Sequence, residues 1–227
     1  MEELKKTVII TGAAFGVGNA TAKLLSENGF HVIATSRNID ELNKIKSDNI
    51  DVYQLDVTEE LAAKEFADTL KDKNVVALIN NAGGGFNLPG NILNDDLEDW
   101  RKSYEVNVIG VVSLTKLIAP HMIKNGGGNV VIISSMAGHF IYKGGSNYTV
   151  AKHATVALAD LLRFELFDKK IRVTEIAPGN INSRGDRDPN TCLNPEDVAD
   201  AIRWAITVPP HVNVEKLTIM HVNNLPR

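Results

Sequence analysis

The sequence predicts an α/β fold, in which a doubly wound parallel sheet of about seven strands carries helices on both faces. Short runs rich in β-branched residues alternate with amphipathic segments along the chain. These runs are continuously apolar, as expected for strands that are covered on both faces. A strand followed by a helix, repeated several times, favours parallel pairing with right-handed crossovers. Because the 227 residues contain no repeat, low-complexity tract or linker, we expect residues 1–227 to form a single domain.

The expected strands and helices alternate along the chain. The strands are expected at residues 7–11, 31–35, 52–55, 75–79, 129–133, 171–176 and 217–220. The helices are expected near residues 17–28, 39–46, 59–71, 95–124, 149–168 and 195–207. Asn194 is expected to cap the last helix, because Asn is a preferred N-cap residue and Pro195 suits the first helical position.

The helix expected at residues 149–168 is apolar over much of its circumference. The residues expected to face the sheet are Ala151, Ala154, Leu158, Leu161 and Leu162, whereas Val156, Phe164 and Phe167 lie largely elsewhere. A helix of this kind is usually buried on more than one side. We expect its second side to pack on another subunit of a homo-oligomer, a dimer or tetramer; the alternative is that another element of the same chain covers it.

Composition and charge argue against several classes of function. The formal net charge of −4 and the isoelectric point near 5.9 give no reason to expect nucleic acid as a partner. The single Cys192 rules out an intramolecular disulfide framework and fits a reducing compartment. No 18-residue apolar stretch is evident, and the first residues are too acidic for a secretory signal, so we expect a cytoplasmic protein that does not enter a membrane. The six histidines lack metal-ligand spacing, and no metal is expected.

A glycine-rich turn lies between the first expected strand and the first expected helix. It reads Thr-Gly-Ala-Ala-Phe-Gly-Val-Gly over residues 11–18. Glycines let the backbone approach a pyrophosphate, and the following helix N-terminus offers free N–H groups and a positive dipole end. An ordinary glycine-rich turn is the alternative. The residues we expect at the phosphates of a dinucleotide are Gly12, Ala14, Phe15, Gly16, Val17 and Gly18.

The end of the second strand bears on the choice of cofactor. NAD-binding chains often carry an acidic residue there, which binds the ribose 2′-hydroxyl. Here the strand ends in Ser36 and Arg37, which suit a 2′-phosphate, so we expect NADP(H) in preference to NAD(H). Asp40 and Glu41 follow one turn later and are the groups expected to compete for Arg37. Asp56, which precedes Val57, suits either the adenine amino group or the cap of the next helix.

Further motifs complete a pattern that covers nearly the whole chain. Asn-Asn-Ala-Gly stands at residues 80–83, and Asn107 lies within Val-Asn-Val-Ile-Gly. Ser135 precedes Tyr148 by thirteen residues, Lys152 follows Tyr148 by four, and Pro-Gly-Asn-Ile-Asn-Ser stands at residues 178–183. Together with the glycine-rich turn, these motifs resemble the short-chain dehydrogenase/reductase family, whose fold is Rossmann-like.

This resemblance implies an NAD(P)-dependent oxidoreductase with a catalytic tetrad of Asn107, Ser135, Tyr148 and Lys152. It also implies cofactor contacts beyond the turn and the second strand. These are Asp56, Val57, Asn81, Ala82, Gly83, Tyr148, Lys152, Pro178, Gly179, Ile181 and Ser183.

The spacing of Tyr148 and Lys152 places the phenol and the ammonium on one face of a helix. Free tyrosine titrates near pH 10. We expect Lys152, with the positive nicotinamide ring of the oxidised cofactor, to move the pKa of Tyr148 toward neutral pH. By resemblance, Tyr148 exchanges a proton with the substrate oxygen, which Ser135 also binds, Lys152 contacts the nicotinamide ribose, and Asn107 anchors a water. The alternatives are that Ser134 replaces Ser135, and that Asn107 only caps or kinks its helix.

The segment that follows the Pro-Gly motif bears on the substrate. Residues 184–193 are short and polar, which favours an open site or a small polar substrate. Arg184 or Arg187 is expected either to hold a substrate carboxylate or to be a solvated cation. The candidate walls of the substrate pocket are Phe86, His139, Phe140, Ile141 and Tyr142.

The C-terminal part of the chain is similar to family members that oxidise serine and other 3-hydroxy acids. The sequence therefore predicts an NADP(H)-dependent oxidoreductase that interconverts a small alcohol, with a 3-hydroxy acid as the candidate, and its carbonyl. The alternative is a non-catalytic NADP(H)-binding sensor or scaffold on the same fold, because fold alone does not fix function.

Overall fold

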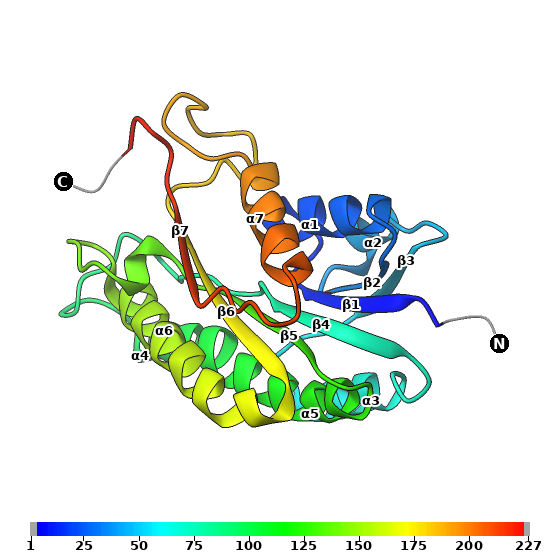
Figure 1. The fold of residues 1–227 in the computed structure, drawn as a ribbon. Helices are drawn as coiled ribbons and strands as arrows, with labels where there is room; N and C mark the ends of the chain where they lie inside the picture. The colour runs from blue at the N-terminus through cyan, green and yellow to red at the C-terminus, as the bar shows by residue number, and fades with distance from the viewer. Residues whose placement is uncertain (1–3, 225–227) are drawn as a thin grey trace.

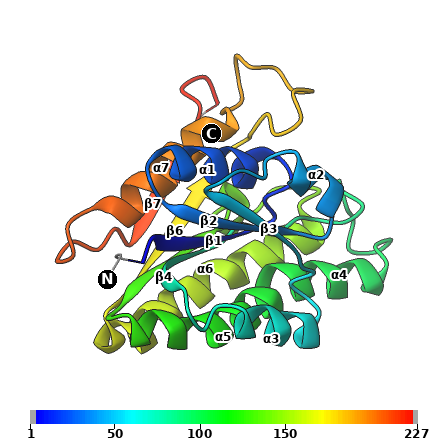
Figure 2. The same cartoon turned by 90° about the vertical axis from the view of Figure 1, so that its right-hand side faces the viewer.

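A computed structural model describes residues 4–224 of the chain. Seven parallel strands form one sheet in the order β3-β2-β1-β4-β5-β6-β7, as Figures 1 and 2 show. The strands are β1 (Lys6–Thr11), β2 (His31–Ser36), β3 (Ile50–Gln54), β4 (Asn74–Asn80), β5 (Gly128–Ile133), β6 (Ile171–Pro178) and β7 (Lys216–Ile219). The predicted doubly wound parallel sheet is confirmed.

Helices cover both faces of the sheet. On one face lie α1 (Gly16–Glu27), α2 (Ile39–Asn43) and α7 (Pro195–Thr207) (Figures 1 and 2). On the other lie α3 (Glu60–Asp68), α4 (Leu97–Tyr104), α5 (Gly110–Lys124) and α6 (Ser146–Leu166). Three short helical segments complete the list: the π-helix η1 (Glu105–Ile109) and the 3₁₀ turns η2 (Met136–Gly138) and η3 (Phe167–Lys169). Asn194 is the N-cap residue of α7, as predicted.

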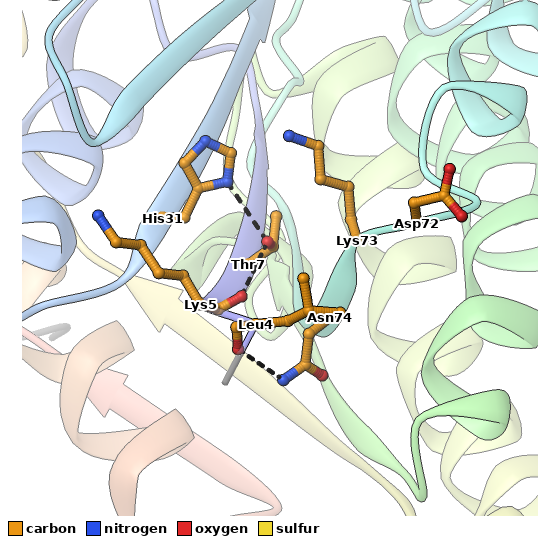
Figure 3. Close-up of a pocket in the computed structure, with 7 residues that line it drawn as sticks. All are labelled: Leu4, Lys5, Thr7, His31, Asp72, Lys73 and Asn74. Carbon is orange, nitrogen blue, oxygen red and sulfur yellow. Dashed lines mark hydrogen bonds between the residues drawn. The ribbon is translucent and has the colours of Figure 1, made fainter. Parts of the chain in front are cut away.

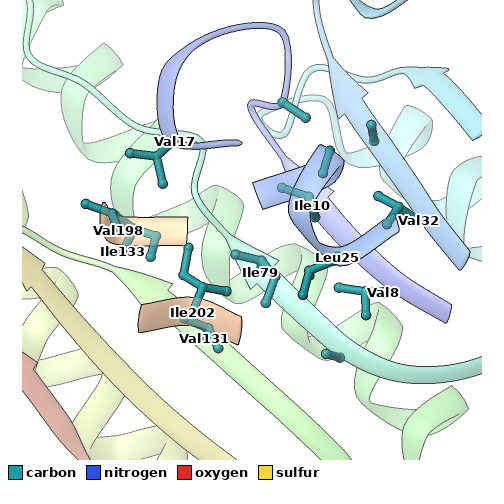
Figure 4. Close-up of a cluster of buried hydrophobic side chains, with 14 of the residues drawn as sticks. Val8, Ile10, Val17, Leu25, Val32, Ile79, Val131, Ile133, Val198 and Ile202 are labelled. Carbon is teal, nitrogen blue, oxygen red and sulfur yellow. The ribbon is translucent and has the colours of Figure 1, made fainter. Parts of the chain in front are cut away.

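Each of the two faces of the sheet packs against the helices in its own hydrophobic cluster. Val8 and Ile10 point to the side of α1 and α7, where they pack with Leu25 and Ile202 (Figure 4). Ile9, between them in sequence, points to the opposite side. All of these side chains are fully buried. The continuous apolar run in β1 is therefore explained by two cores, one on each side of the sheet.

The long helix predicted at residues 95–124 is interrupted. It consists of α4, the π-helix η1 and α5 in succession, with Asn107 inside the π-helix. The stretch Leu97–Lys124 contains an 18-residue window with a mean hydropathy of 1.5, apolar enough for a membrane-spanning helix, so the expectation that no such stretch exists is wrong. Half of its most apolar window is buried inside the fold, as in the core helix of a globular domain.

Helix α6 differs in one respect from its predicted faces. Ala151 and Ala159 are buried against the sheet, and Leu158 and Leu162 pack beside them. Leu161, predicted to face the sheet, is instead about half exposed, as are Val150 and, to a greater extent, Phe164. Leu161 and Phe164 are three positions apart, and Val150 precedes Leu161 by about three helical turns, so the three residues form one apolar stripe along the outer side of the helix.

Candidate active site

The strand order reverses direction between β1 and β4, and a cavity of about 750 Å³ opens at the carboxyl ends of these strands. This is where open parallel sheets bind ligands, because the connections there diverge to opposite faces. The predicted cofactor residues that line the cavity are Gly12, Phe15, Ser36, Arg37, Asp56, Val57, Asn81, Ala82 and Gly83. The volume lies in the range of roughly 300–1,000 Å³ that is typical of ligand sites.

A smaller cavity of about 210 Å³ lies at the opposite, amino-terminal edge of the sheet (Figure 3). Lys5, His31 and Lys73 surround it. His31 and Lys73 share Asp51, at 3.0 and 3.7 Å. None of the predicted cofactor residues lines this cavity, so we place the candidate active site at the carboxyl edge.

The glycine-rich turn passes directly against the loop that follows β4. Gly12 has a φ of +67°, and a Cβ there would lie 2.9 Å from the Cα of Ala82. A Cβ on Gly18 would lie 2.6 Å from the carbonyl oxygen of Gly12. Only glycine fits this approach without a shift of the backbone. The turn delivers the N-terminus of α1, which begins at Gly16, to the cavity edge.

The remaining turn residues take different roles. The side chains of Ala14 and Val17 are buried in the core, so only their main-chain groups remain for a phosphate. Phe15 is exposed and lines the cavity. A Cβ on Gly16 would lie 3.0 Å from the Cβ of Ser183, which brings the Pro-Gly motif to the same turn.

Thr11 holds the two central strands together at the site. Its hydroxyl oxygen accepts hydrogen bonds from the main-chain N–H groups of Asn81 and Ala82, at 3.0 and 2.9 Å. The Asn81 side chain in turn donates to the carbonyl oxygens of Thr11 and Gly12, at 2.8 and 3.2 Å. The side-chain amide of Asn81 therefore fixes the turn, and the contact of Asn81 with the cofactor stays a prediction.

Arg37 extends from the end of β2, and 75% of its side chain is exposed. Its guanidinium lies 3.8 Å from the Asp56 carboxylate, whereas Glu41 pairs with Lys44 at 2.7 Å. Asp56 is thus the acidic neighbour of Arg37, in place of the predicted competition from Glu41. The weak pairing and high exposure leave Arg37 available to an anion.

Asp56 is not the cap of α3, because the N-cap position belongs to Glu59. The Asp56 carboxylate accepts hydrogen bonds from the main-chain N–H and the hydroxyl of Thr58, at 3.0 and 2.8 Å. This turn holds Asp56 and Val57 at the cavity wall. The contact of Asp56 with adenine stays a prediction.

Lys152 and Tyr148 lie on one face of α6, as their spacing predicts. The Lys152 Nζ is 5.8 Å from the centre of the Tyr148 ring and donates a hydrogen bond to the carbonyl oxygen of Ile133, at 2.9 Å. Lys152 is only 4% exposed. Burial lowers the pKa of Lys152 to about 8, and the negative charge of Glu175 opposes that fall.

Burial raises the pKa of Tyr148 above its ordinary value in the chain alone. The Ser135 hydroxyl and the charge of Arg187 act in the opposite direction but do not outweigh it. The prediction of a pKa closer to neutral includes the charge of the oxidised cofactor and stays a prediction. In the chain alone, the desolvation of the phenol, which the sequence could not reveal, dominates.

The two adjacent serines, Ser134 and Ser135, have different hydrogen-bond partners. Ser135 precedes η2, its hydroxyl oxygen accepts from the N–H of Ala137 at 3.1 Å, and it reaches the Tyr148 phenol. Ser134 is buried and donates to the Glu175 carboxylate and to the carbonyl oxygen of Ile176. The geometry therefore favours Ser135 over Ser134 as the serine beside the reacting group.

Asn107 is buried at the centre of the π-helix. Its side-chain N–H₂ donates to the carbonyl oxygens of Gly84 and Ser103, both at 2.7 Å, and its oxygen accepts from the N–H of Gly84 at 3.2 Å. A Cβ on Gly83 would lie 2.6 Å from that oxygen and 3.1 Å from the Lys152 Nζ. Asn107 thus holds the loop after β4 against Lys152. π-Helical turns are frequent at functional sites.

The other predicted residues lie around this centre. Pro178 ends β6, the Gly179 N–H donates to Ile219, and Ile181 pairs with Leu193 in an isolated bridge. Of the candidate substrate residues, Phe86 and Arg184 line the cavity, and Phe140, Ile141 and Tyr142 are exposed. Over residues 4–224, no group of three or more His, Cys, Asp or Glu side chains is placed to hold a metal ion.

The comparison with known proteins identifies the family. The family of short chain dehydrogenases matches residues 6–191, and the chain belongs to it. An uncharacterised oxidoreductase of Mycobacterium tuberculosis is 37% identical over 95% of this chain and 90% of its own. The NADP-dependent 3-hydroxy acid dehydrogenase of Escherichia coli is 33% identical over 95% and 94%. The closed form of serine dehydrogenase complexed with NADP+ is 32% identical over 97% and 96%, with a TM-score of 0.90.

Sequence reasoning missed several residues that build the site. The Asn147 side chain forms two hydrogen bonds with the main chain of Phe86. It donates to the carbonyl oxygen at 2.9 Å and accepts from the N–H at 3.3 Å. Ser103 also binds the loop that follows β4, and no local pattern marks it. Thr11 stands in the glycine-rich motif, but the motif itself assigns no role to its hydroxyl. Glu175 does carry a signal, because an acidic residue in the middle of a buried apolar strand is unusual.

We expect Gly83→Ala to lower kcat about tenfold or more, because the new methyl group would displace Asn107 or Lys152. Gly84→Ala is the matched control, since a Cβ there meets nothing within 4 Å. Turnover and thermal unfolding would be measured for both. Equal turnover in the two variants would contradict the tight packing around Gly83.

Proposed function

We propose that the protein is an NADP(H)-dependent oxidoreductase that interconverts a small alcohol, specifically a 3-hydroxy acid, and its carbonyl. The convergence of Ser135, Tyr148 and Lys152 carries this proposal. Lys152 and Asn107 lie directly against Gly83, which lines the carboxyl-edge cavity. Sensor proteins do not need a buried ammonium beside a buried phenol, whereas acid–base chemistry does.

The residues around the cavity fit NADP(H). The close approach at Gly12 and the N-terminus of α1 suit a pyrophosphate, and Arg37 and Ser36 suit a 2′-phosphate. Relatives that bind or depend on NADP support the same choice. When bound, the cofactor supplies or accepts the hydride.

The chain's own residues would handle the proton and the substrate oxygen. In carbonyl reduction, Tyr148 gives its phenolic proton to the oxygen that becomes the alcohol, and Ser135 donates a hydrogen bond to that oxygen. The positive charge of Lys152 stabilises the phenolate that is left. Because burial raises the pKa of Tyr148, the phenol stays protonated and ready to donate at neutral pH.

Arg187 supports a substrate that carries a carboxylate. The guanidinium lies close enough to Tyr148 for its charge to lower the phenol's pKa. An arginine in an exposed polar loop suits bidentate binding of a carboxylate. The named relatives that act on 3-hydroxy acids and serine favour the same class of substrate. The single Cys192 is free, which is compatible with the cytoplasmic location that we propose.

Tyr148→Phe should reduce turnover by at least about a hundredfold, because it removes the proton that is transferred. NADPH affinity should stay within about threefold of wild type, since the ring is retained. Tyr142→Phe is the matched control, because Tyr142 also lies near Tyr148 but is half exposed. Full activity in Tyr148→Phe would overturn the proposed role of the phenol. If the wild-type protein binds NADPH but turns over no 3-hydroxy acid or small carbonyl, the sensor function is favoured instead.

Arg37→Ala should weaken NADPH binding about tenfold or more, through loss of a charge-assisted contact with the 2′-phosphate. NADH binding should change little. Titration calorimetry with both cofactors measures this, and Arg203→Ala, on the distant helix α7, is the control. An equal loss of affinity for NADH would mean that Arg37 acts elsewhere.

We also propose that the apolar stripe of α6 packs against a second copy of the chain. Phe164 and Phe167 are 79% and 71% exposed, which is costly for large aromatic side chains. Wild type should therefore sediment as a dimer or tetramer, and Phe164→Asp should dissociate it. Leu61→Asp, which changes an equally exposed residue on α3, should leave the assembly intact. A monomeric wild-type protein would refute this interface.

A further inference from the structure

Glu175 is a buried acid in the interior of the sheet. It lies on β6, paired with Ile132 of β5 and Lys216 of β7, and is 1% exposed. Its side chain points to the face covered by α6, the same face as that of Val173. An ionised carboxylate is costly to bury unless charged and hydrogen-bonding partners compensate it. The neighbours of Glu175 therefore indicate what it does.

Three elements bring partners to this carboxylate. The Ser134 hydroxyl, at the end of β5, donates a hydrogen bond to it. The His139 Nε2, just after η2, lies 3.1 Å from the same oxygen. Lys152 comes from α6, and its Nζ donates to the carbonyl oxygen of Ile133, the residue before Ser134, at 2.9 Å. The charges of Lys152 and Glu175 interact there. The η2 turn itself is packed tightly on this helix, because a Cβ on Gly138 would lie 2.7 Å from the Lys152 carbonyl oxygen.

Two other cations on this face, Lys216 and Arg163, are already paired. Lys216 and Arg163 both bind Asp160, at 2.9 and 2.7 Å. Among residues 4–224, the buried charged side chains are Asp99, Lys152 and Glu175. Asp99 accepts a hydrogen bond from Asn87, away from Glu175. Lys152 is thus the buried cation that faces the buried anion.

We propose that Glu175 is a positioning residue for the reaction: held by Ser134 and His139, its carboxylate keeps Lys152 charged and fixed beside Tyr148. The proposal rests on the proposed function, since it assigns the charge of Lys152 a role in proton exchange at Tyr148. Burial alone drives Lys152 toward the neutral amine, and the negative charge of Glu175 opposes this. The hydrogen bonds from Ser134 and His139 prevent the carboxylate from turning away.

The titration of Lys152 tests the charge effect without any substrate. The full chain, labelled with ¹³C-lysine, would be titrated by NMR, and Lys152 assigned from the spectrum of Lys152→Arg. In Glu175→Gln, which keeps the shape and removes the charge, the acid dissociation constant of Lys152 should rise about tenfold or more. Glu175→Asp, which keeps the charge, should stay within about threefold of wild type. An unchanged Lys152 titration in folded Glu175→Gln overturns the proposal.

The pH profile of carbonyl reduction tests the effect on the reaction. Reduction needs Lys152 charged, so activity should fall on the alkaline side as Lys152 loses its proton. In Glu175→Gln this alkaline limb should move toward lower pH by about one pH unit, with NADPH affinity within about threefold of wild type. Ser134→Ala, which removes a hydrogen bond and keeps the carboxylate, should move the limb by less than about a third of that. A shifted Lys152 titration with an unmoved limb refutes the positioning role.

Two further outcomes keep this proposal separate from the proposed function. If Glu175→Gln does not fold, Glu175→Thr, which is smaller and suits a strand, removes the same charge and carries the same expectations. If wild type turns over no carbonyl substrate, the proposed function fails, and the positioning role in the reaction fails with it. The lysine titration then still decides whether Glu175 holds the charge on Lys152, so the two failures are told apart.

Discussion

The buried ammonium of Lys152 is the constraint around which the site is arranged. Its Nζ lies among the Ile133 carbonyl oxygen, the Tyr148 ring and the position of Gly83. Each contact comes from a different element: the end of β5, helix α6 and the loop after β4. A charge in such a place must be surrounded by fixed dipoles, because water cannot solvate it. The surrounding polar groups therefore hold the Lys152 ammonium and its neighbours in place.

The π-helix η1, which lies between α4 and α5, also helps to fix the groups around Lys152. A regular α-helix places each residue in register with those three and four positions away, whereas the π-turn at η1 inserts one wider step. Asn107 can then reach the Gly84 carbonyl oxygen across the helix surface while also binding Ser103 within its own helix. The loop after β4 is thereby fixed at both ends, at Gly84 by Asn107 and at Asn81 by Thr11. Its middle, Gly83, passes between Asn107 and Lys152 with no space for a side chain.

The sequence predicted the sheet well, and also the placement of Tyr148 and Lys152 on one helix face, for identifiable reasons. Continuous apolar runs mark strands with a core on each face, and the spacing of Tyr148 and Lys152 follows from helical geometry alone. The failures have equally physical causes. The desolvation of the Tyr148 phenol depends on residues distant in sequence and could not be foreseen. The acidic neighbour of Arg37 is Asp56, which lies just after β3, the strand that pairs with β2. Glu175 was overlooked because it lies within an apolar run that predicts only a strand.

The energetics explain why a buried Lys152 and a buried Glu175 would be kept together. A lysine whose pKa falls from 10.5 to about 8 destabilises the folded state at neutral pH by about 3 kcal/mol. Because the pKa is lowered, this penalty is complete below about pH 8 and disappears as the pH rises toward 10.5. Without an opposing acid the penalty would be larger still. An apolar residue would fill the position of Lys152 at no such cost, so the buried ammonium is in keeping with the chemical role that we propose for it. The charge of Glu175 opposes the fall in the pKa of Lys152 and so reduces this cost.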